Sequence, residues 1–116
     1  MGLYLCYTRC SNCRKIEAAL NEEKIDFEKR DLVAQPPTKE ELRNWWEKSE
    51  LELRRFFNTS GVVYRELKLK DKLPHLSDEE KLNLLASDGK LVKRPIWVDN
   101  ERVLVGNDVK KLLAAN

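Results

Sequence analysis

The hydrophobic pattern at the start of the chain predicts a strand, a helix and a second strand. Residues 3–8 carry apolar side chains at the density of a buried strand. Apolar positions then recur at a spacing of three to four residues at Ile16, Ala19 and Leu20, which indicates a helix with one buried face. Residues 25–32 mix apolar and charged side chains, which indicates a strand with one face exposed to solvent. We therefore expect a βαβ unit.

The middle of the chain, at about residues 38–88, is predicted to form a helical insert. Its first helix begins at residues 38–41, where Thr-Lys-Glu-Glu follows two prolines and has the pattern of a capping box. Residues 51–57 are also helical in pattern, and Gly61 then offers a residue suited to a left-handed helix end. A second capping-box pattern at residues 77–80 begins another helix.

The last third of the chain predicts a hairpin and a final helix. Residues 95–98 and 102–105 are short apolar runs separated by three polar residues, which is typical of an antiparallel hairpin. Gly106 then turns the chain, and Asn107 or Asp108 is expected to cap the last helix. The positions expected to face inward from this helix are Val109, Leu112 and Leu113.

The predicted order of elements is βαβ, helical insert, then ββα. This order resembles a thioredoxin-like fold, an α/β fold whose four strands form a mixed parallel and antiparallel sheet. The 116 residues suit a single domain over residues 1–116, because a chain of this length buries roughly two-thirds of its unfolded surface. Disulfide staples are therefore not needed for folding.

Composition and charge narrow the classes of function. The 22 basic and 20 acidic side chains are interspersed and leave a net charge of +2, which gives no broad field for nucleic acid or an anionic membrane. No apolar run approaches the ~20 residues of a membrane span, and we expect no signal peptide. A cytoplasmic protein is predicted. In that reducing compartment, clustered cysteines are catalytic, redox-sensing or metal-binding more often than structural.

Cys10 and Cys13 form a Cys-x-x-Cys pair at the junction between the first predicted strand and the first predicted helix. Free backbone N–H groups and the helix dipole stabilise an anion there, so the pKa of Cys10 should fall below the free value of about 8.5. We expect Cys10 to attack a disulfide or an oxidised substrate. Cys13 would then resolve the mixed intermediate by closing the Cys10–Cys13 bond.

Three arginines are candidates for the same site. Arg9 and Arg14 lie on either side of the cysteine pair and would lower the pKa of Cys10. The alternative is that both are exposed surface arginines with no role at the site. Pro95 opens a strand, where a cis peptide would bring Arg94 within reach of Cys10. Arg94 would then offer its donors to an anion or a glutathione carboxylate; the alternative is a solvated arginine.

A metal site is the competing interpretation of the thiols. Cys6, Cys10, Cys13 and the single histidine, His75, would make up a Cys₃His zinc site. The expected geometry disfavours this site, because Cys6 belongs to a buried strand and His75 lies far along the chain. We expect Cys6 to pack as a small hydrophobic residue and His75 to lie in a surface turn, so no metal is predicted.

The three tryptophans allow either core packing or a surface for a partner. Core packing is expected for at least two of Trp45, Trp46 and Trp97, because of their helical or strand spacing. One member of the adjacent pair should stay partly exposed.

These motifs together resemble the arsenate reductase/Spx family of thioredoxin-fold proteins nearly from end to end. The resemblance implies a thioredoxin-like domain with a helical insert, a nucleophilic cysteine at the position of Cys10 and a structurally important Arg-Pro-Ile segment. We predict that the substrate site around the cysteine pair includes Arg9, Ser11, Asn12, Arg14, Asn58 and Pro95. The matching segments are residues 10–15, 36–38, 57–67, 85–89, 94–96 and 104–106.

The two branches of this family imply different functions. Arsenate reductases coupled to glutathione and glutaredoxin hold their oxyanion with three arginines, and only Arg94 matches here, with Asn58 and Gly106 at the other two positions. Each lost charge-assisted hydrogen bond is worth roughly 1.5–3 kcal/mol, so weak arsenate binding is implied. Cys13 is similar to the Spx branch, whose regulators sense disulfide stress and bind the C-terminal domain of the RNA polymerase α-subunit.

The leading hypothesis is an arsenate reductase-like or Spx-like oxidoreductase that cycles between the Cys10/Cys13 dithiol and disulfide. It would act on a small thiol-linked or oxyanion substrate. Electrons would come from glutathione, glutaredoxin or thioredoxin, without a bound cofactor. The alternative is a redox-sensing transcriptional regulator of Spx type, although residues 42–57 lack the glycine that such regulators use for the polymerase contact.

Overall fold

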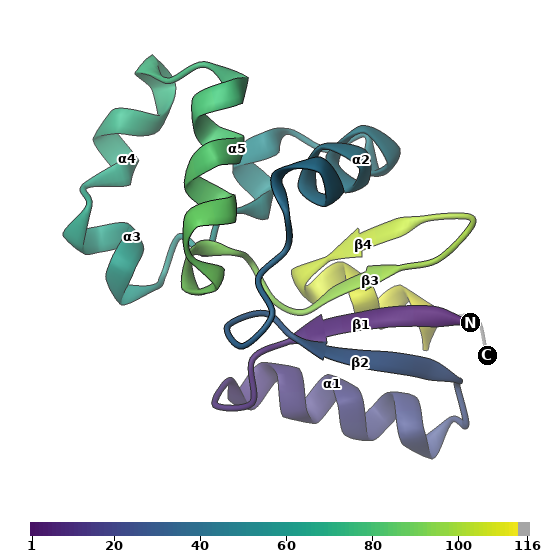
Figure 1. Cartoon of the computed structure of the whole chain (residues 1–116). Helices are drawn as coiled ribbons and strands as arrows, with labels where there is room; N and C mark the ends of the chain where they lie inside the picture. The colour runs from purple at the N-terminus through teal and green to yellow at the C-terminus, as the bar shows by residue number, and fades with distance from the viewer. Residues whose placement is uncertain (114–116) are drawn as a thin grey trace.

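A four-stranded mixed sheet organises the computed structural model, which describes residues 1–113 (Figure 1). The strand order is β2-β1-β3-β4. Strand β1 (Gly2–Cys6) pairs in parallel with β2 (Phe27–Asp31) and antiparallel with β3 (Ile96–Val98). Strand β4 (Val103–Val105) pairs antiparallel with β3. The α/β class and the mixed four-stranded sheet that the sequence predicts are confirmed.

One face of the sheet is covered by α1 (Ser11–Glu22) and by the 3₁₀ helix Gly106–Leu112. Successive strand residues point to opposite faces, so Tyr4 and Cys6 share the face that α1 covers. Both side chains are buried in the same apolar cluster as residues of α1. The other members of that cluster are Cys13, Ile16, Leu20, Trp97, Val109 and Leu112.

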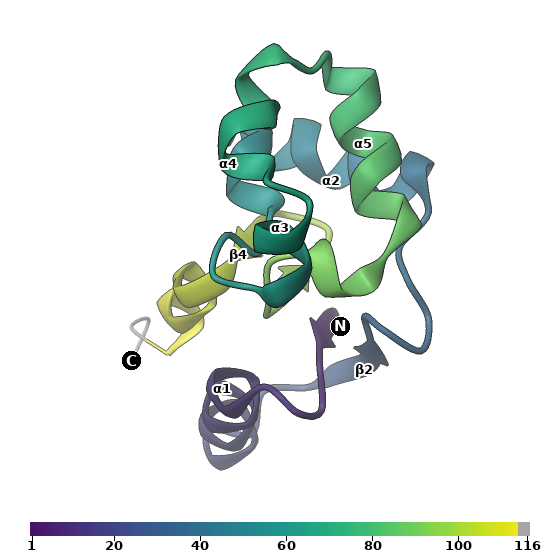
Figure 2. The same cartoon turned by 90° about the vertical axis from the view of Figure 1, so that its left-hand side faces the viewer.

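The helical insert lies on the opposite face of the sheet and at one end of it (Figure 2). Its two longest helices, α2 (Lys39–Ser49) and α5 (Asp78–Ser87), pack against each other. Two short helices complete it, α3 (Val62–Glu66) and α4 (Leu69–Lys72). The connecting 3₁₀ turns are Leu53–Phe56, Leu73–His75 and Gly89–Leu91.

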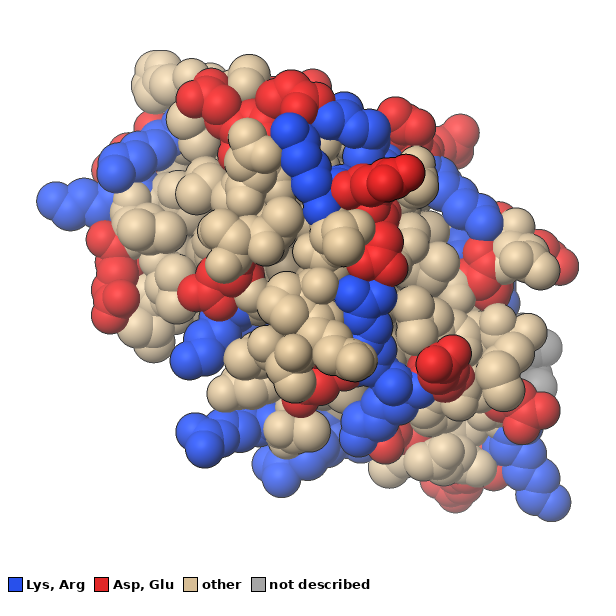
Figure 3. Space-filling view, viewed as in Figure 1, with Lys and Arg blue, Asp and Glu red and all other residues tan. Residues whose placement is uncertain are grey.

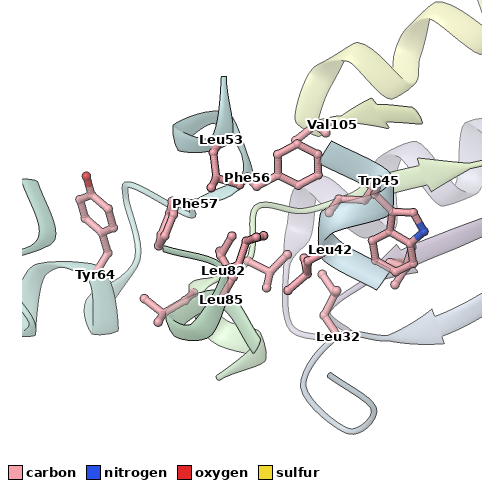
Figure 4. Packing of buried hydrophobic residues seen from close by; sticks show 14 of the residues in the cluster. Leu32, Leu42, Trp45, Leu53, Phe56, Phe57, Tyr64, Leu82, Leu85 and Val105 are labelled. Carbon is pink, nitrogen blue, oxygen red and sulfur yellow. The ribbon is translucent and has the colours of Figure 1, made fainter. Parts of the chain in front are cut away.

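The core between the insert and the sheet is built from large apolar side chains (Figure 4). Leu42 on α2 and Leu85 on α5 are fully buried, and they pack in one cluster with Val105 of β4. Trp45 and Trp97 are buried, whereas Trp46 is half-buried and donates its indole N–H to the Leu51 carbonyl over 2.9 Å. Core packing of two tryptophans and partial exposure of one of the adjacent pair are confirmed.

Both predicted capping boxes are present. At the start of α2 the Glu41 backbone N–H donates to Thr38 Oγ1 over 3.1 Å, and the Thr38 N–H donates to the Glu41 carboxylate over 2.9 Å. Ser77 and Glu80 make the same reciprocal pair at the start of α5, at 3.1 and 3.0 Å. Each box satisfies two backbone donors that the first turn of a helix leaves free.

Two predictions for the insert are wrong in detail. Of residues 51–57 only Leu53–Phe56 are helical, and they form a 3₁₀ turn whose first and last residues, three apart, are both buried. Gly61 does not end a helix in a left-handed conformation; its φ is −79° and it precedes α3. Glu50, with φ of 60°, ends α2 in that conformation instead.

The last element is a 3₁₀ helix, Gly106–Leu112, and not the capped α-helix that the sequence predicts. Its buried residues recur at a spacing of three, which fits the 3₁₀ period. Neither Asn107 nor Asp108 caps this helix, because each side chain binds another residue. Asn107 accepts from Asn12 over 3.1 Å, and Asp108 pairs with Arg55 at 3.1 Å. Val109 and Leu112 face inward as predicted, and Leu113 is half-buried.

Acidic and basic side chains are mixed over the face shown in Figure 3, as the interspersed charges of the sequence predict. Within residues 1–113, no helix combines the length and the apolar character needed to cross a bilayer.

Gly89 fixes how the end of the insert meets the sheet. A Cβ atom at this position would overlap the backbone carbonyl of Leu32, just after β2. We therefore expect Gly89→Ala to lower the free energy of unfolding in urea by about 1–3 kcal/mol, because backbone must move to admit the methyl group. The exposed neighbour gives the control: Lys90→Ala should change stability little. Equal stabilities of wild type and Gly89→Ala would contradict this close packing.

Candidate active site

Cys10 is the N-cap residue of α1, with φ of −86° and ψ of 115°. Its half-buried thiol makes no conventional capping hydrogen bond, but it faces the backbone N–H of Cys13 in the first turn. Burial is the largest influence on the pKa of Cys10 and opposes ionisation. The Cys13 N–H and side chain, together with the Arg94 guanidinium, outweigh burial and lower the pKa. The site therefore favours a thiolate at the position where the sequence predicts the nucleophile.

Arg94 reaches the thiol from the segment before β3. The Arg94–Pro95 peptide bond is cis, and the Arg94 side chain interacts with the Cys10 sulfur. Two further contacts orient the guanidinium: Nη1 donates to the Lys90 carbonyl over 3.1 Å, and Cζ lies 5.1 Å from the centre of the Tyr7 ring. Arg94 is thus held beside the thiol.

Cys13 is the opposite of Cys10 in exposure and acidity. It is fully buried, and its pKa is raised by its hydrogen bond with Cys6, by burial and by Cys10. The Tyr4 hydroxyl donates to the Cys13 carbonyl over 2.7 Å and fixes this turn of the helix. Burial raises the pKa of Tyr4, so it stays a hydroxyl donor. The two thiols therefore differ in the way that a nucleophile and a resolving cysteine must differ.

Cys6 lies beside Cys13, which sequence reasoning missed. Its predicted burial is observed, at 1% exposure, but its side chain is not isolated in the core, because it hydrogen-bonds with the Cys13 thiol. The sequence feature that could have predicted this contact is the alternation of side chains along β1. It places Cys6 on the same face of the sheet as Tyr4, under α1.

An open cavity of about 420 Å³ adjoins Cys10. Asn58 lies in its wall, buried, with its backbone N–H donating to the Leu91 carbonyl over 2.7 Å. A Cβ atom on Gly61 would come within 2.5 Å of the Asn58 amide nitrogen, so this glycine leaves room for the amide. The residues that line the cavity are Cys10, Asn12, Asn58, Ser60, Gly61, Val62, Lys93 and Arg94.

Lys93 is a second cation in this wall that the sequence analysis did not identify. Gly106 has φ of +63°, and a Cβ atom on it would lie 3.0 Å from Lys93 Cε, so the lysine side chain occupies the space beside this glycine. Lys93 also borders a neighbouring hollow with Arg54 and Arg55. The only local signal was its place next to Arg94, because residues distant in sequence decide where its side chain lies.

The other predicted site residues are less closely placed. Pro95 is buried, while Arg9, Ser11 and Arg14 are exposed and lie outside the cavity lining. Their roles in substrate binding stay predictions. Among residues 1–113, no group of three or more His, Cys, Asp or Glu side chains is arranged to hold a metal ion. His75 is exposed in the turn Leu73–His75 of the insert.

The contact between Arg94 and Cys10 predicts how the thiol reacts. Arg94→Gln removes the charge that favours the thiolate, so the pKa of Cys10 should rise and its alkylation by iodoacetamide below pH 8 should slow several-fold. The pH profile of alkylation, followed by mass spectrometry, measures this shift. Arg14→Gln is the matched control, because Arg14 is exposed and outside the cavity. Identical profiles for wild type and Arg94→Gln would contradict the assigned electrostatics.

Comparison with known proteins agrees with this geometry. The uncharacterized protein YusI of Bacillus subtilis is 52% identical over 100 residues, covering 86% of this chain and 85% of YusI. The regulatory protein MgsR of the same organism is 30% identical over 95% of this chain and 86% of its own length. The global transcriptional regulator Spx of Streptococcus mutans is 29% identical over 84% of this chain and 69% of its own length.

Solved structures share the fold over nearly the whole chain. An ArsC family related protein from Bacteroides fragilis matches with a TM-score of 0.93 and 46% identity, covering 99% of this chain and 97% of that one. Arsenate reductase from Vibrio cholerae matches with a TM-score of 0.85 and 27% identity, covering 97% and 95%. The resemblance proposed from the motifs is confirmed, and the family pattern spans residues 5–115. The chain belongs to the ArsC family.

Proposed function

We propose that this protein is a thiol-disulfide oxidoreductase that cycles between the Cys10/Cys13 dithiol and disulfide. The observation that carries the proposal is the asymmetry of the pair. Cys10 is half-buried at a helix N-terminus with a lowered pKa, whereas Cys13 is fully buried with a raised pKa. Such a pair suits attack by the first sulfur and resolution by the second.

In the first step the Cys10 thiolate attacks one sulfur of a substrate disulfide. A Cys10–substrate disulfide forms and the other half of the substrate leaves as a thiolate. Cys13 then attacks the Cys10 sulfur and gives its proton to a departing substrate thiolate; the bond between Cys10 and the second half of the substrate breaks, and the Cys10–Cys13 bond forms. Two thiols of a reductant, such as two glutathione molecules or one glutaredoxin or thioredoxin dithiol, restore the protein and become a disulfide.

The cavity wall supports a substrate with an anionic group. Arg94 and Lys93 supply positive charge beside Cys10, and the buried Asn58 adds a polar side chain. A thiol-linked oxyanion or a glutathione mixed disulfide fits this chemistry. Relatives in the family include arsenate reductases. We place the cycle in the cytoplasm, where the glutathione and thioredoxin systems supply electrons.

The trapping variant is Cys13→Ser, which leaves the nucleophile but removes the resolving thiol. With hydroxyethyl disulfide as the probe, it should accumulate one equivalent of mixed disulfide on Cys10, seen as a mass shift on that peptide. Cys10→Ser is the matched control and should show neither adduct nor reductase activity with glutathione above background. An adduct on another residue, or full activity in Cys10→Ser, would overturn the proposal.

A redox-sensing regulator is the second candidate, and the relatives MgsR and Spx favour it. In this case closure of the Cys10–Cys13 bond would change affinity for a protein partner, and the probe is the C-terminal domain of the α-subunit of RNA polymerase. We expect retention of that domain to differ several-fold between reduced and diamide-treated protein. Cys10→Ser should bind equally before and after diamide. If neither form retains the domain, this candidate is eliminated.

A further inference from the structure

Three thiols meet at the start of α1, although the proposed cycle uses only two of them. Cys6 and Cys13 belong to one buried cluster against which Cys10 packs, and Cys13 interacts with both of the other cysteines. Cys10 lines the cavity and is half-buried, whereas Cys13 and Cys6 are 0% and 1% exposed. Cys13 is the shared neighbour of the other two.

The scaffold around the inner pair holds this arrangement in place. Cys6 ends β1 and is paired with Asp31 of β2, and its backbone carbonyl accepts from the Leu32 N–H over 2.9 Å. The hydrogen bond from Tyr4 to the Cys13 carbonyl ties the same strand to α1. Cys6 lies on β1 and Cys13 on α1, and the Tyr4 hydrogen bond holds these two elements together next to the thiols.

One charged side chain favours an anionic Cys6 in the reacting state. In the reduced protein the Cys13 thiol lowers the pKa of Cys6 most, burial opposes the shift and Lys29 assists it. Once Cys13 is part of a disulfide its proton is gone, and Lys29 is the group that still favours the Cys6 thiolate. Lys29 lies on β2, paired with Glu17 of α1 at 3.0 Å.

We propose that Cys6 is a third redox residue that accepts the disulfide from the outer pair by internal exchange. The step rests on the proposed Cys10/Cys13 cycle. The Cys6 thiolate attacks the Cys13 sulfur of the Cys10–Cys13 disulfide, the Cys6–Cys13 bond forms, and Cys10 leaves as a thiolate. One disulfide replaces another, so no external oxidant or reductant is consumed.

The exchange changes how far the disulfide is exposed to solvent. A Cys10–Cys13 disulfide presents the half-buried Cys10 sulfur to reductants, whereas a Cys6–Cys13 disulfide joins two sulfurs that are at most 1% exposed. Glutathione reaches the inner bond only after Cys10 attacks Cys13 and reverses the exchange. The leaving Cys10 thiolate is stabilised by the Cys13 N–H and Arg94, which favours the forward direction. The inner disulfide therefore stores the oxidised state.

Disulfide mapping of the whole protein tests the exchange. Reduced protein is treated with diamide, quenched with acid, alkylated and digested for mass spectrometry. In the wild type we expect mainly a Cys6–Cys13 crosslink with Cys10 alkylated, and in Cys6→Ala a Cys10–Cys13 crosslink. Wild-type protein that contains only the Cys10–Cys13 crosslink would overturn the exchange. Absence of any crosslink in folded Cys6→Ala would instead overturn the proposed cycle.

Cys10→Ser tests the entry point. Without its exposed thiol, the Cys6–Cys13 crosslink should form at least several-fold more slowly than in the wild type, and near-UV circular dichroism checks that the variant is folded. Formation at the wild-type rate would show that Cys10 does not deliver the disulfide and would overturn the relay.

The storage role has its own readout. Oxidised wild type should be reduced by glutathione several-fold more slowly than oxidised Cys6→Ala, measured as the return of alkylable thiols with time. Equal rates would overturn storage in the inner disulfide.

Discussion

The hydrogen bond from the Tyr4 hydroxyl to the Cys13 carbonyl ties the first turn of α1 to the central strand of the sheet, and the site depends on it. Together with the bond from the Cys10 N–H to the Tyr7 carbonyl, it positions the N-terminus of the helix. Cys10 therefore lies at the mouth of the turn, where the Cys13 N–H faces its sulfur, and Cys13 lies inside, against Cys6. Tyr4 and Cys6 share a face of β1, so one strand supplies both the tie and the third thiol.

The second half of the site comes from the far end of the chain. The segment before β3 brings Lys93 and Arg94 to the thiol, and its backbone is held to the insert because the Lys93 N–H donates to the Phe56 carbonyl over 2.8 Å. Asn58 is fixed by the same pairing of backbones, since its N–H donates to Leu91. The insert is thus a wall of the site as well as a cover for the sheet.

These cations and the asymmetric thiols give one pocket that suits both branches of the family. A nucleophilic thiolate beside Arg94 is the requirement for reduction of an oxyanion or a mixed disulfide, and a buried partner thiol is the requirement for a lasting oxidised state. Arsenate reductases and transcriptional regulators both occur among the relatives. In this chain a third cysteine, Cys6, lies beside Cys13 in the apolar cluster under the pocket.

Local signals in the sequence determined the order of elements, the two capping boxes, the position of Cys10 at a strand-to-helix junction and the Arg94–Pro95 segment, because periodicity, caps and helix dipoles act within a few residues. Tertiary structure decided the rest. The 3₁₀ helix Gly106–Leu112 has no side-chain cap, because Asn107 and Asp108 bond to Asn12 and Arg55 instead. Lys93 joins the site because Gly106 leaves space for it, and Cys6 meets Cys13 because α1 packs on that face of β1. Such contacts depend on how two distant segments pack, and neither segment encodes that packing alone.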